Sequence, residues 1–373
     1  MSDSRLDGAA PTTVRGALAS GDPLPGTVGF AGRVDDCLVR DVLGRRPVFV
    51  DATDPERWAF DPTDLTDAEL LPAGCRLPVG EPVAAAESVW SLPDPDPRRR
   101  EEAVAAVERT VHERVVTESA PAAVAFSGGV DSAVVAAGRP DAPLYVAGFE
   151  GCHDVTAAHE AATAADRAAD LQTVELDHET LREAVRAVVA ATGRSNPMDV
   201  SIAVPLFCVA RRAAADGHDR LAVGQGADEL FGGYAKVRTP EEDDRVDATT
   251  VRGARRETVL SLPDQLARDV VTLRAAGVEP VAPFLHDDVI AAALRLPGDA
   301  LVADGVGKVA LRETADGVVP EPARVADKKA VQYGTYVSRE LDRLARRAGF
   351  KRRMNDHVGR YVAALTAGDL DRG

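Results

Sequence analysis

The segment Ser127–Ser132 (SGGVDS) combines residue types that suit a phosphate-binding turn. Gly128 and Gly129 let the backbone fold closely against a ligand, and the backbone amides of such a turn attract phosphate oxygens at the start of a helix. The hydroxyls of Ser127 and Ser132 add donors, and the Asp131 carboxylate is placed to hold Mg²⁺ on the phosphates. The segment has no lysine and the chain has no GxxxxGKS or GxxxxGKT motif, which argues against a P-loop enzyme that transfers a γ-phosphate. We therefore expect a magnesium-bound polyphosphate here; the alternative is a tight turn without a ligand.

A second glycine-rich turn, Gly224–Tyr234 (GQGADELFGGY), carries two adjacent carboxylates, Asp228 and Glu229. It follows an apolar run, as the first turn does, so it is a second place where backbone could meet a ligand. The alternative is an acidic helix start in which the glycines only allow close packing.

A pair of lysines, Lys328 and Lys329, stands out because lysine is rare in this chain. Adjacent lysines are ordinarily a solvated surface pair. Here only five of the 44 basic residues are lysines, and three of the five fall within residues 308–329, which favours a role in chemistry. The five are Lys236, Lys308, Lys328, Lys329 and Lys351.

The elements that would position these turns alternate between helical and strand-like patterns. The helical segments are 101–118, 155–169, 179–191 and 201–215, and the strand-like segments are 122–126, 144–149, 171–176 and 221–223. This alternation predicts an α/β fold with a parallel sheet and helices on both of its faces.

The residues before this region predict a small, mainly antiparallel β domain over 1–92, because short β-prone runs alternate with Gly, Pro and Asp clusters. A proline-rich linker over 93–100 follows, then the α/β domain over 101–345 and a C-terminal tail over 346–373. We expect the polar and acidic residues 239–250 to form a mobile surface loop.

The composition limits the partners. The formal net charge of −16 repels phosphate backbones, so a general nucleic-acid binder is disfavoured. The acidic excess with few lysines suits a halophile's protein. Four scattered cysteines, an acidic start and the lack of a long apolar run predict a soluble cytoplasmic protein without a disulfide framework or a membrane span.

The motifs together resemble the asparagine synthetase family. SGGVDS is similar to the pyrophosphate loop of ATP-pyrophosphatase enzymes, and Gly224–Tyr234 is nearly the family block GEGADELFGGY. Pro283–Leu285 resembles the family segment PFLD, and Lys308–Arg312 resembles its helix of form KxxLR. The resemblance implies an adenine nucleotide α-hydrolase-like fold, ATP as substrate, and cleavage of ATP between the α and β phosphates.

The resemblance also implies roles for individual residues. The backbone at Phe126, Ala147, Val223 and Gly224 would line the adenosine, and Asp131 and Asp228 would bind Mg²⁺. Lys328 would meet the charge that develops on pyrophosphate, with Lys329 as its neighbour. An acid, most simply aspartate, would form an acyl-adenylate that ammonia converts to the amide.

A fainter resemblance covers the N-terminal part. Leu38–Phe49 is similar to the LARDxxGxxPLYY stretch of the family's glutaminase domain, which makes residues 1–92 a truncated glutaminase-like domain. That domain uses an N-terminal cysteine as nucleophile, whereas position 2 here is Ser2. We therefore expect ammonia from solution or from a separate glutaminase, and either a partner of that kind or a homo-oligomer.

Two departures leave the substrate open. Gln225 stands where the family has Glu, and a neutral amide cannot act as a base; Glu229 is a candidate substitute. His286 stands where PFLD has Asp, either to contact substrate or as a surface residue at a loop edge. The alternatives are an adenylating amide-forming enzyme on another carboxylate, β-lactam-synthetase-like or tRNA-related, or a non-catalytic nucleotide-binding subunit.

Overall fold

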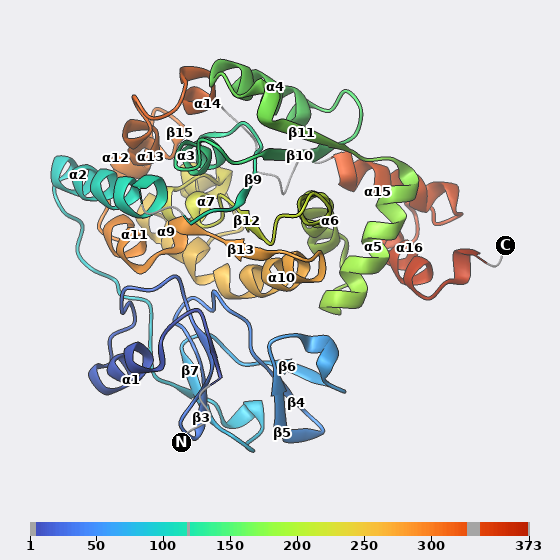
Figure 1. Ribbon diagram of the computed structural model, residues 1–373, viewed down its shortest axis with the longest axis horizontal. Coiled ribbons are helices and arrows are strands. Elements are labelled where there is room, and N and C mark those ends of the chain that lie inside the picture. Colours follow the sequence, from blue (N-terminus) through green and yellow to red (C-terminus); the bar gives the residue numbers. More distant parts are fainter. Residues whose placement is uncertain (1–4, 118–119, 327–335, 372–373) are drawn as a thin grey trace. The chain divides into compact units, whose positions relative to one another are not determined.

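The computed structural model describes residues 5–117, 120–326 and 336–371 and divides the chain into two units (Figure 1). Unit 1 consists of residues 1–119, 224–270 and 282–318, and unit 2 consists of residues 120–223, 271–281 and 319–373. Each unit is therefore assembled from separate stretches of chain. The predicted domain boundaries at 92, 100 and 345 follow the chain linearly and stay a prediction.

Unit 2 is built around a five-stranded sheet in the order β11-β10-β9-β12-β13, in which every pairing is parallel. The strands are β9 (Ala123–Ala125), β10 (Leu144–Gly148), β11 (Leu171–Glu175), β12 (Arg220–Ala222) and β13 (Glu279–Val281). The chain leaves β9 toward β10 and β11 on one side and returns to β12 on the other. This reversal of strand order is where open α/β sheets bind their ligands.

Helices cover both faces of this sheet, as the sequence predicts. Figure 1 shows α4 on one side of β10 and β11 and α6 on the other, and both helices pack on these strands. The confirmed fold class is α/β. The helices of the unit are α3 (Val130–Ala137), α4 (His153–Ala164), α5 (His178–Thr192), α6 (Pro197–Ala215), α14 (Glu321–Val325), α15 (Tyr336–Arg347) and α16 (His357–Thr366), with the end of α10 (Leu262–Ala275).

Local sequence signals set the ends of these helices. Asp177 caps α5 by accepting a hydrogen bond from the Thr180 amide at 2.7 Å, and Gly193 ends it in the left-handed region. Asn196 caps α6 through the Asp199 amide at 2.9 Å, and Pro197 occupies the first turn. Such caps satisfy amides that have no acceptor inside the helix.

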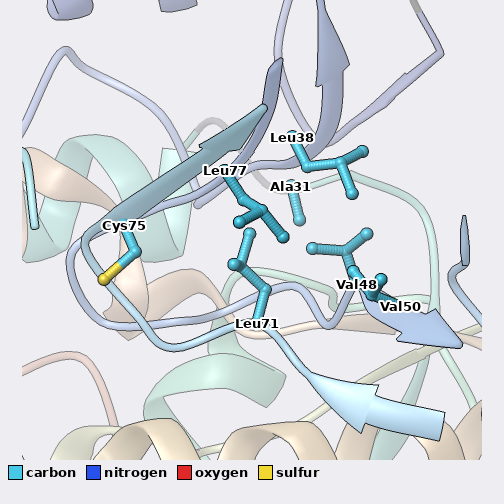
Figure 2. Packing of buried hydrophobic residues seen from close by; sticks show 7 residues of the cluster. All are labelled: Ala31, Leu38, Val48, Val50, Leu71, Cys75 and Leu77. Carbon is cyan, nitrogen blue, oxygen red and sulfur yellow. The ribbon is translucent and has the colours of Figure 1, made fainter. Parts of the chain in front are cut away.

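Unit 1 contains the antiparallel sheets that the sequence predicts in the N-terminal part. One sheet has the order β1-β2-β3-β7-β8 and the other the order β5-β4-β6. Their shared core is a cluster of buried residues, drawn as sticks in Figure 2: Ala31, Leu38, Val48, Val50, Leu71, Cys75 and Leu77. The strands are β1 (Leu6–Asp7), β2 (Ala31–Val34), β3 (Cys37–Arg40), β4 (Phe49–Asp51), β5 (Asp54–Ala59), β6 (Ala68–Leu70), β7 (Cys75–Pro78) and β8 (Glu87–Ser88). Helix α1 (Pro11–Ser20) lies between β1 and β2 in the chain, where the sequence pattern predicts only short strands.

The rest of unit 1 is mainly helical. Its helices are α2 (Arg100–Val111), α7 (Ala227–Phe231), α8 (Ala235–Arg238), α9 (Val251–Leu260), most of α10, α11 (Asp287–Ala293), α12 (Gly298–Leu301) and α13 (Val309–Thr314), with a short hairpin of β14 (Val302–Ala303) and β15 (Val306–Gly307). A π-helical segment, His112–Thr117, continues α2.

Buried charge joins the N-terminal sheets to these helices. Arg45 pairs with Asp41 at 2.8 Å and with Asp287 at 2.6 Å, and all three side chains are at most 2% exposed. The Asp287 carboxylate also accepts the Thr27 amide at 2.7 Å. Removing one partner of such a buried pair leaves an uncompensated charge and typically costs about 3–5 kcal/mol. The N-terminal sheets are therefore an integral part of unit 1.

The proline-rich segment is held by arginines of α9. Arg256 donates to the carbonyls of Leu92 and Pro93, each at 2.8 Å, and Arg252 donates to the carbonyl of Pro95 at 2.9 Å. Proline cannot donate a backbone hydrogen bond, so an extended proline-rich segment offers carbonyls, and guanidinium groups satisfy them.

Candidate functional site

The SGGVDS segment lies at the carboxyl end of β9 in unit 2. The Phe126 amide donates to the Tyr145 carbonyl at 2.7 Å and so extends the pairing of β9 with β10. The backbone then turns, Gly129 forms the N-cap, and α3 begins at Val130. The predicted arrangement of strand, glycine turn and helix is therefore present.

Gly128 is the position in this turn that only glycine can occupy. Its φ is +76°, and a Cβ there would lie 2.5 Å from the Ala157 carbonyl oxygen and 2.7 Å from the Ala157 carbonyl carbon. Both atoms belong to the backbone of α4, which cannot move aside as a side chain would. The missing side chain thus lets the turn pack against α4 and form a backbone cradle of the kind that phosphates occupy.

The two serines of the turn have different surroundings. The Ser132 hydroxyl is buried, donates to the Gly129 carbonyl at 3.1 Å and accepts the Ser127 amide at 3.2 Å. Ser132 therefore holds the turn together. Ser127 is half-buried, and its hydroxyl lies 3.4 Å from that of Ser132. Asp131 lies in the first turn of α3, where the helix dipole favours a carboxylate.

The residues expected around adenosine lie at the same edge of the sheet. Ala147 is the penultimate residue of β10, Phe126 follows β9, and Val223 follows β12, where its amide donates to the Val281 carbonyl at 2.9 Å. Strands β9, β10 and β12 are parallel, so their carboxyl ends meet at one edge. Unit 2 therefore brings together every predicted nucleotide residue from Phe126 to Val223.

Gly224, the last of the predicted nucleotide residues, begins the second glycine turn. This turn belongs to unit 1, and an ion pair holds one of its carboxylates. Asp228, in α7, pairs with Lys308 at 2.8 Å between Oδ1 and Nζ. Lys308 has a left-handed backbone (φ +61°) as the N-cap of α13, and its amide donates to the Phe231 carbonyl at 3.1 Å. A non-glycine residue in this conformation is uncommon, so the fold holds Lys308 in place at some cost in strain.

Glu229, beside Asp228, is buried and hydrogen-bonded. Its Oε1 accepts from the Tyr234 hydroxyl at 2.6 Å, and the residue is 5% exposed. Burial, with the charge of Asp228 as a smaller cause, raises the pKa of Glu229 to about 7. Burial and the neighbouring carboxylates likewise raise the pKa of Tyr234.

Gln225 has a partner that its sequence surroundings do not predict. Its side-chain amide donates to Asp269 Oδ2 at 2.5 Å, and Asp269 Oδ1 accepts from Arg268 Nε at 2.7 Å. Asp269 and Arg268 are 6% and 4% exposed. Nothing in the pattern of α10 distinguishes Asp269 from other acidic residues, whereas the rarity of lysine did draw attention to Lys308.

Three further predicted residues are His286 and the pair Lys328 and Lys329. His286 is partly buried and caps a helix: its Nδ1 accepts the Asp288 amide at 3.1 Å as the N-cap of α11, and burial lowers its pKa. A contact between His286 and substrate stays a prediction. Lys328 and Lys329 lie outside the described residues. Within the described ranges, no three His, Cys, Asp or Glu side chains group as a metal site would require. Magnesium on a nucleotide needs only one or two protein carboxylates, and Asp131 and Asp228 offer that donor type.

A parallel sheet with a glycine turn leading into a helix at its switch point defines an α/β nucleotide-binding class of domain. The family described as asparagine synthase matches residues 102–266 and 241–365, which is more than half of the chain. The chain belongs to the asparagine synthase family, as its motifs predict.

Individual relatives are distant and longer. A putative glutamine-hydrolysing asparagine synthetase 1 from Methanocaldococcus jannaschii is 26% identical over 268 residues, which are 62% of this chain and 49% of that protein. The glutamine-hydrolysing asparagine synthetase B of Escherichia coli (strain K12) is 28% identical over 252 residues, 61% of this chain and 43% of that protein. The nodule asparagine synthetase of Pisum sativum is 29% identical over 207 residues, 51% of this chain and 33% of that protein. The chain thus matches half or less of the length of these relatives.

The part of the chain that the structure describes contains no helix long and apolar enough to cross a membrane.

Proposed function

We propose that this protein is a cytoplasmic carbon–nitrogen ligase that uses ATP to amidate a carboxylate and forms AMP and pyrophosphate. The acid is aspartate and the nucleophile is ammonia, so the product is asparagine. The carboxylate attacks the α-phosphorus of ATP, pyrophosphate leaves, and the acyl-adenylate that remains reacts with the amine. Membership of the asparagine synthase family supports this reaction class, and the Gly128 turn is the structural observation that carries it.

The turn suits pyrophosphate as a leaving group. Its backbone amides and the Ser127 hydroxyl can donate to phosphate oxygens without a lysine in the loop, and the start of α3 adds a favourable dipole. We assign to Lys328 the role of neutralising the negative charge that develops on the departing pyrophosphate. We assign Asp131 and Asp228 as the residues that would hold magnesium, which would neutralise charge on the phosphates.

Lys308 has a preparatory part in this proposal. Its ion pair with Asp228 Oδ1, at 2.8 Å, fixes the orientation of the carboxylate that we assign to magnesium before nucleotide binds. Charges that are fixed in advance lower the barrier because they need no reorganisation during the reaction.

A second candidate acid is favoured by one observation. Gln225 replaces the family glutamate, and in this structure it is bonded to Asp269 and has no charge of its own. A different carboxylate substrate with the same adenylation chemistry would fit this change. In either case the nitrogen comes as ammonia, free or from a separate glutaminase.

One assay tests the proposal. We expect the purified full-length protein, given labelled ATP, Mg²⁺ and ammonium chloride in molar potassium chloride, to release AMP and pyrophosphate when aspartate is added. Asparagine should appear in equal amount. Release with another acid and not with aspartate would support the second candidate. ADP as the nucleotide product, or no cleavage with any acid, would contradict the proposed function.

A further inference from the structure

The last two helices of unit 2 carry a surface whose charge is opposite to that of the whole chain. Residues 339–360 contain eight lysines and arginines and three acidic residues, a net charge of +5, whereas the chain as a whole carries −16. All eight basic residues are exposed, and we call them the basic surface: Arg339, Arg343, Arg346, Arg347, Lys351, Arg352, Arg353 and Arg360. Their charges therefore face solvent and do not neutralise buried acids.

Packing and hydrogen bonds give the basic surface a defined shape. Helix α15 packs on α16 (Figure 1), and the Phe350 ring, between the two helices in the chain, meets the Tyr361 ring edge-on with 6.1 Å between centroids. The Asp342 carboxylate accepts from Arg352 at 2.7 Å and shares a hydrogen bond with His357 at 2.8 Å. One carboxylate of α15 thus holds the connecting residues and the start of α16 in place.

Four members of the basic surface make no ion pair with any residue that the structure describes: Arg347, Lys351, Arg353 and Arg360. Helix stability accounts only for Arg347, because a cation in the last turn of α15 interacts favourably with the helix dipole. Lys351 and Arg353 lie beyond that helix, and Arg360 lies near the start of α16, where the dipole disfavours a cation. Helix stability therefore does not explain this concentration of positive charge.

The chemistry of the basic surface suits phosphate groups in a chain. Arginine supplies seven of its eight charges, and the planar guanidinium group can donate two parallel hydrogen bonds to one phosphate. A nucleic acid carries such a group on every nucleotide, and neutralising its phosphates releases condensed counterions, which is a driving force that an acidic protein does not supply.

We propose that the basic surface binds the phosphodiester backbone of a nucleic acid. The net charge of −16 confines this contact to the basic surface, because the rest of the chain repels phosphates. The inference concerns a macromolecular partner and does not depend on the proposed function.

The test measures the fluorescence anisotropy of a labelled oligouridine RNA of about 20 nucleotides, titrated with the full-length protein in 50 to 200 mM potassium chloride. We expect a Kd of about 1–100 µM at 100 mM salt. Each phosphate contact on a single strand contributes about 0.7 to the slope of log Kd against log salt concentration, so the four uncompensated cations predict a slope of about 3. A duplex DNA of the same length is titrated in parallel, and the tighter of the two identifies the kind of nucleic acid.

Three results with the wild-type protein would overturn the inference. The first is no binding of either nucleic acid at about 0.1 mM protein and 50 mM salt, and the second is a slope below about 1. The third is tighter binding of poly-L-glutamate than of both nucleic acids at equal charge concentration, which would assign the basic surface to an acidic protein.

A paired substitution tests the basic surface itself. Arg347→Gln with Arg353→Gln should lower the slope by about 1.4 and weaken RNA binding about 20-fold at 100 mM salt, because two phosphate contacts are lost. The matched control is Arg76→Gln with Arg109→Gln, which removes the same charge from exposed positions on β7 and α2 of unit 1 and should bind as the wild type does. Both double variants should unfold at the wild-type urea concentration. Equal weakening in the two would mean that the total charge of the protein, and not the basic surface, governs binding.

Discussion

The two glycine turns of this protein are similar in sequence and differ in what holds them. The turn at Ser127–Ser132 in unit 2 is shaped by backbone, with Gly128 against the α4 main chain and the Ser132 hydroxyl bonded within the turn. The turn at Gly224–Tyr234 in unit 1 is shaped by side chains from elsewhere, since Lys308 pairs with Asp228 and Asp269 binds Gln225.

This difference predicts different sensitivity to mutation. Contacts to backbone cannot adjust, because moving one main-chain atom moves the whole helix, so an added atom costs stability and function together. The ends of long side chains can move aside with little loss of packing. Changes in the second turn should therefore affect charge and turnover more than folding.

The largest effect is expected for Gly128→Ala. The new Cβ would meet the Ala157 carbonyl at 2.5 Å at a φ of +76°, so the turn must open. We expect a loss of about 2–4 kcal/mol in the free energy of unfolding, measured by urea denaturation, and loss of pyrophosphate release. Gly193→Ala is the matched control in the same unit, because its φ is +67° and nothing lies within 4 Å. It should cost only about 1 kcal/mol. Equal losses for the two variants would show that the contact with α4 is unimportant.

A smaller effect is expected for Glu229→Gln and depends on pH. The pKa of Glu229 is raised from 4.5 to about 7. At a pH between these two values, the folded protein keeps a proton that the unfolded chain has lost. Wild-type stability therefore falls as pH rises through this range and levels off above it. Gln keeps the hydrogen bond from Tyr234 and cannot ionise. The free energy of unfolding of the variant, relative to that of the wild type, should therefore increase by of order 2 kcal/mol from pH 5 to pH 8. Denaturation is measured in EDTA, and an identical pH dependence of the two proteins would refute the assignment.

The smallest effect on stability is expected for Gly233→Ala. Its Cβ would meet Asp228 Oδ1 and Lys308 Cε, and these flexible ends can separate. We expect less than about 1 kcal/mol of lost stability but at least a tenfold lower turnover, because the Asp228–Lys308 pair is displaced. Gly16→Ala in α1, with nothing within 4 Å, should stabilise by about 0.5–1 kcal/mol and leave turnover unchanged. If Gly233→Ala lost as much stability as Gly128→Ala, the proposed difference between the two turns would be wrong.

The sequence predicted the sheet well because its strands are local apolar runs. The predicted segments 144–149 and 171–176 correspond to β10 and β11, and the predicted helix at 179–191 corresponds to α5. Helix α1 was missed because a ten-residue helix with Gly16 and no side-chain N-cap gives a weak periodic signal.

The sequence by itself determined the fold class, the family and the first turn. Each depends on residues that are neighbours in the chain: an apolar strand, glycines that allow a left-handed backbone, and a helix start. Only the tertiary structure decided the surroundings of the second turn. Asp269 and Lys308 are 44 and 80 residues from their partners, Gln225 and Asp228, and nothing local encodes such pairing. Burial, which raises the pKa of Glu229, is likewise a property of the packed protein and not of any segment.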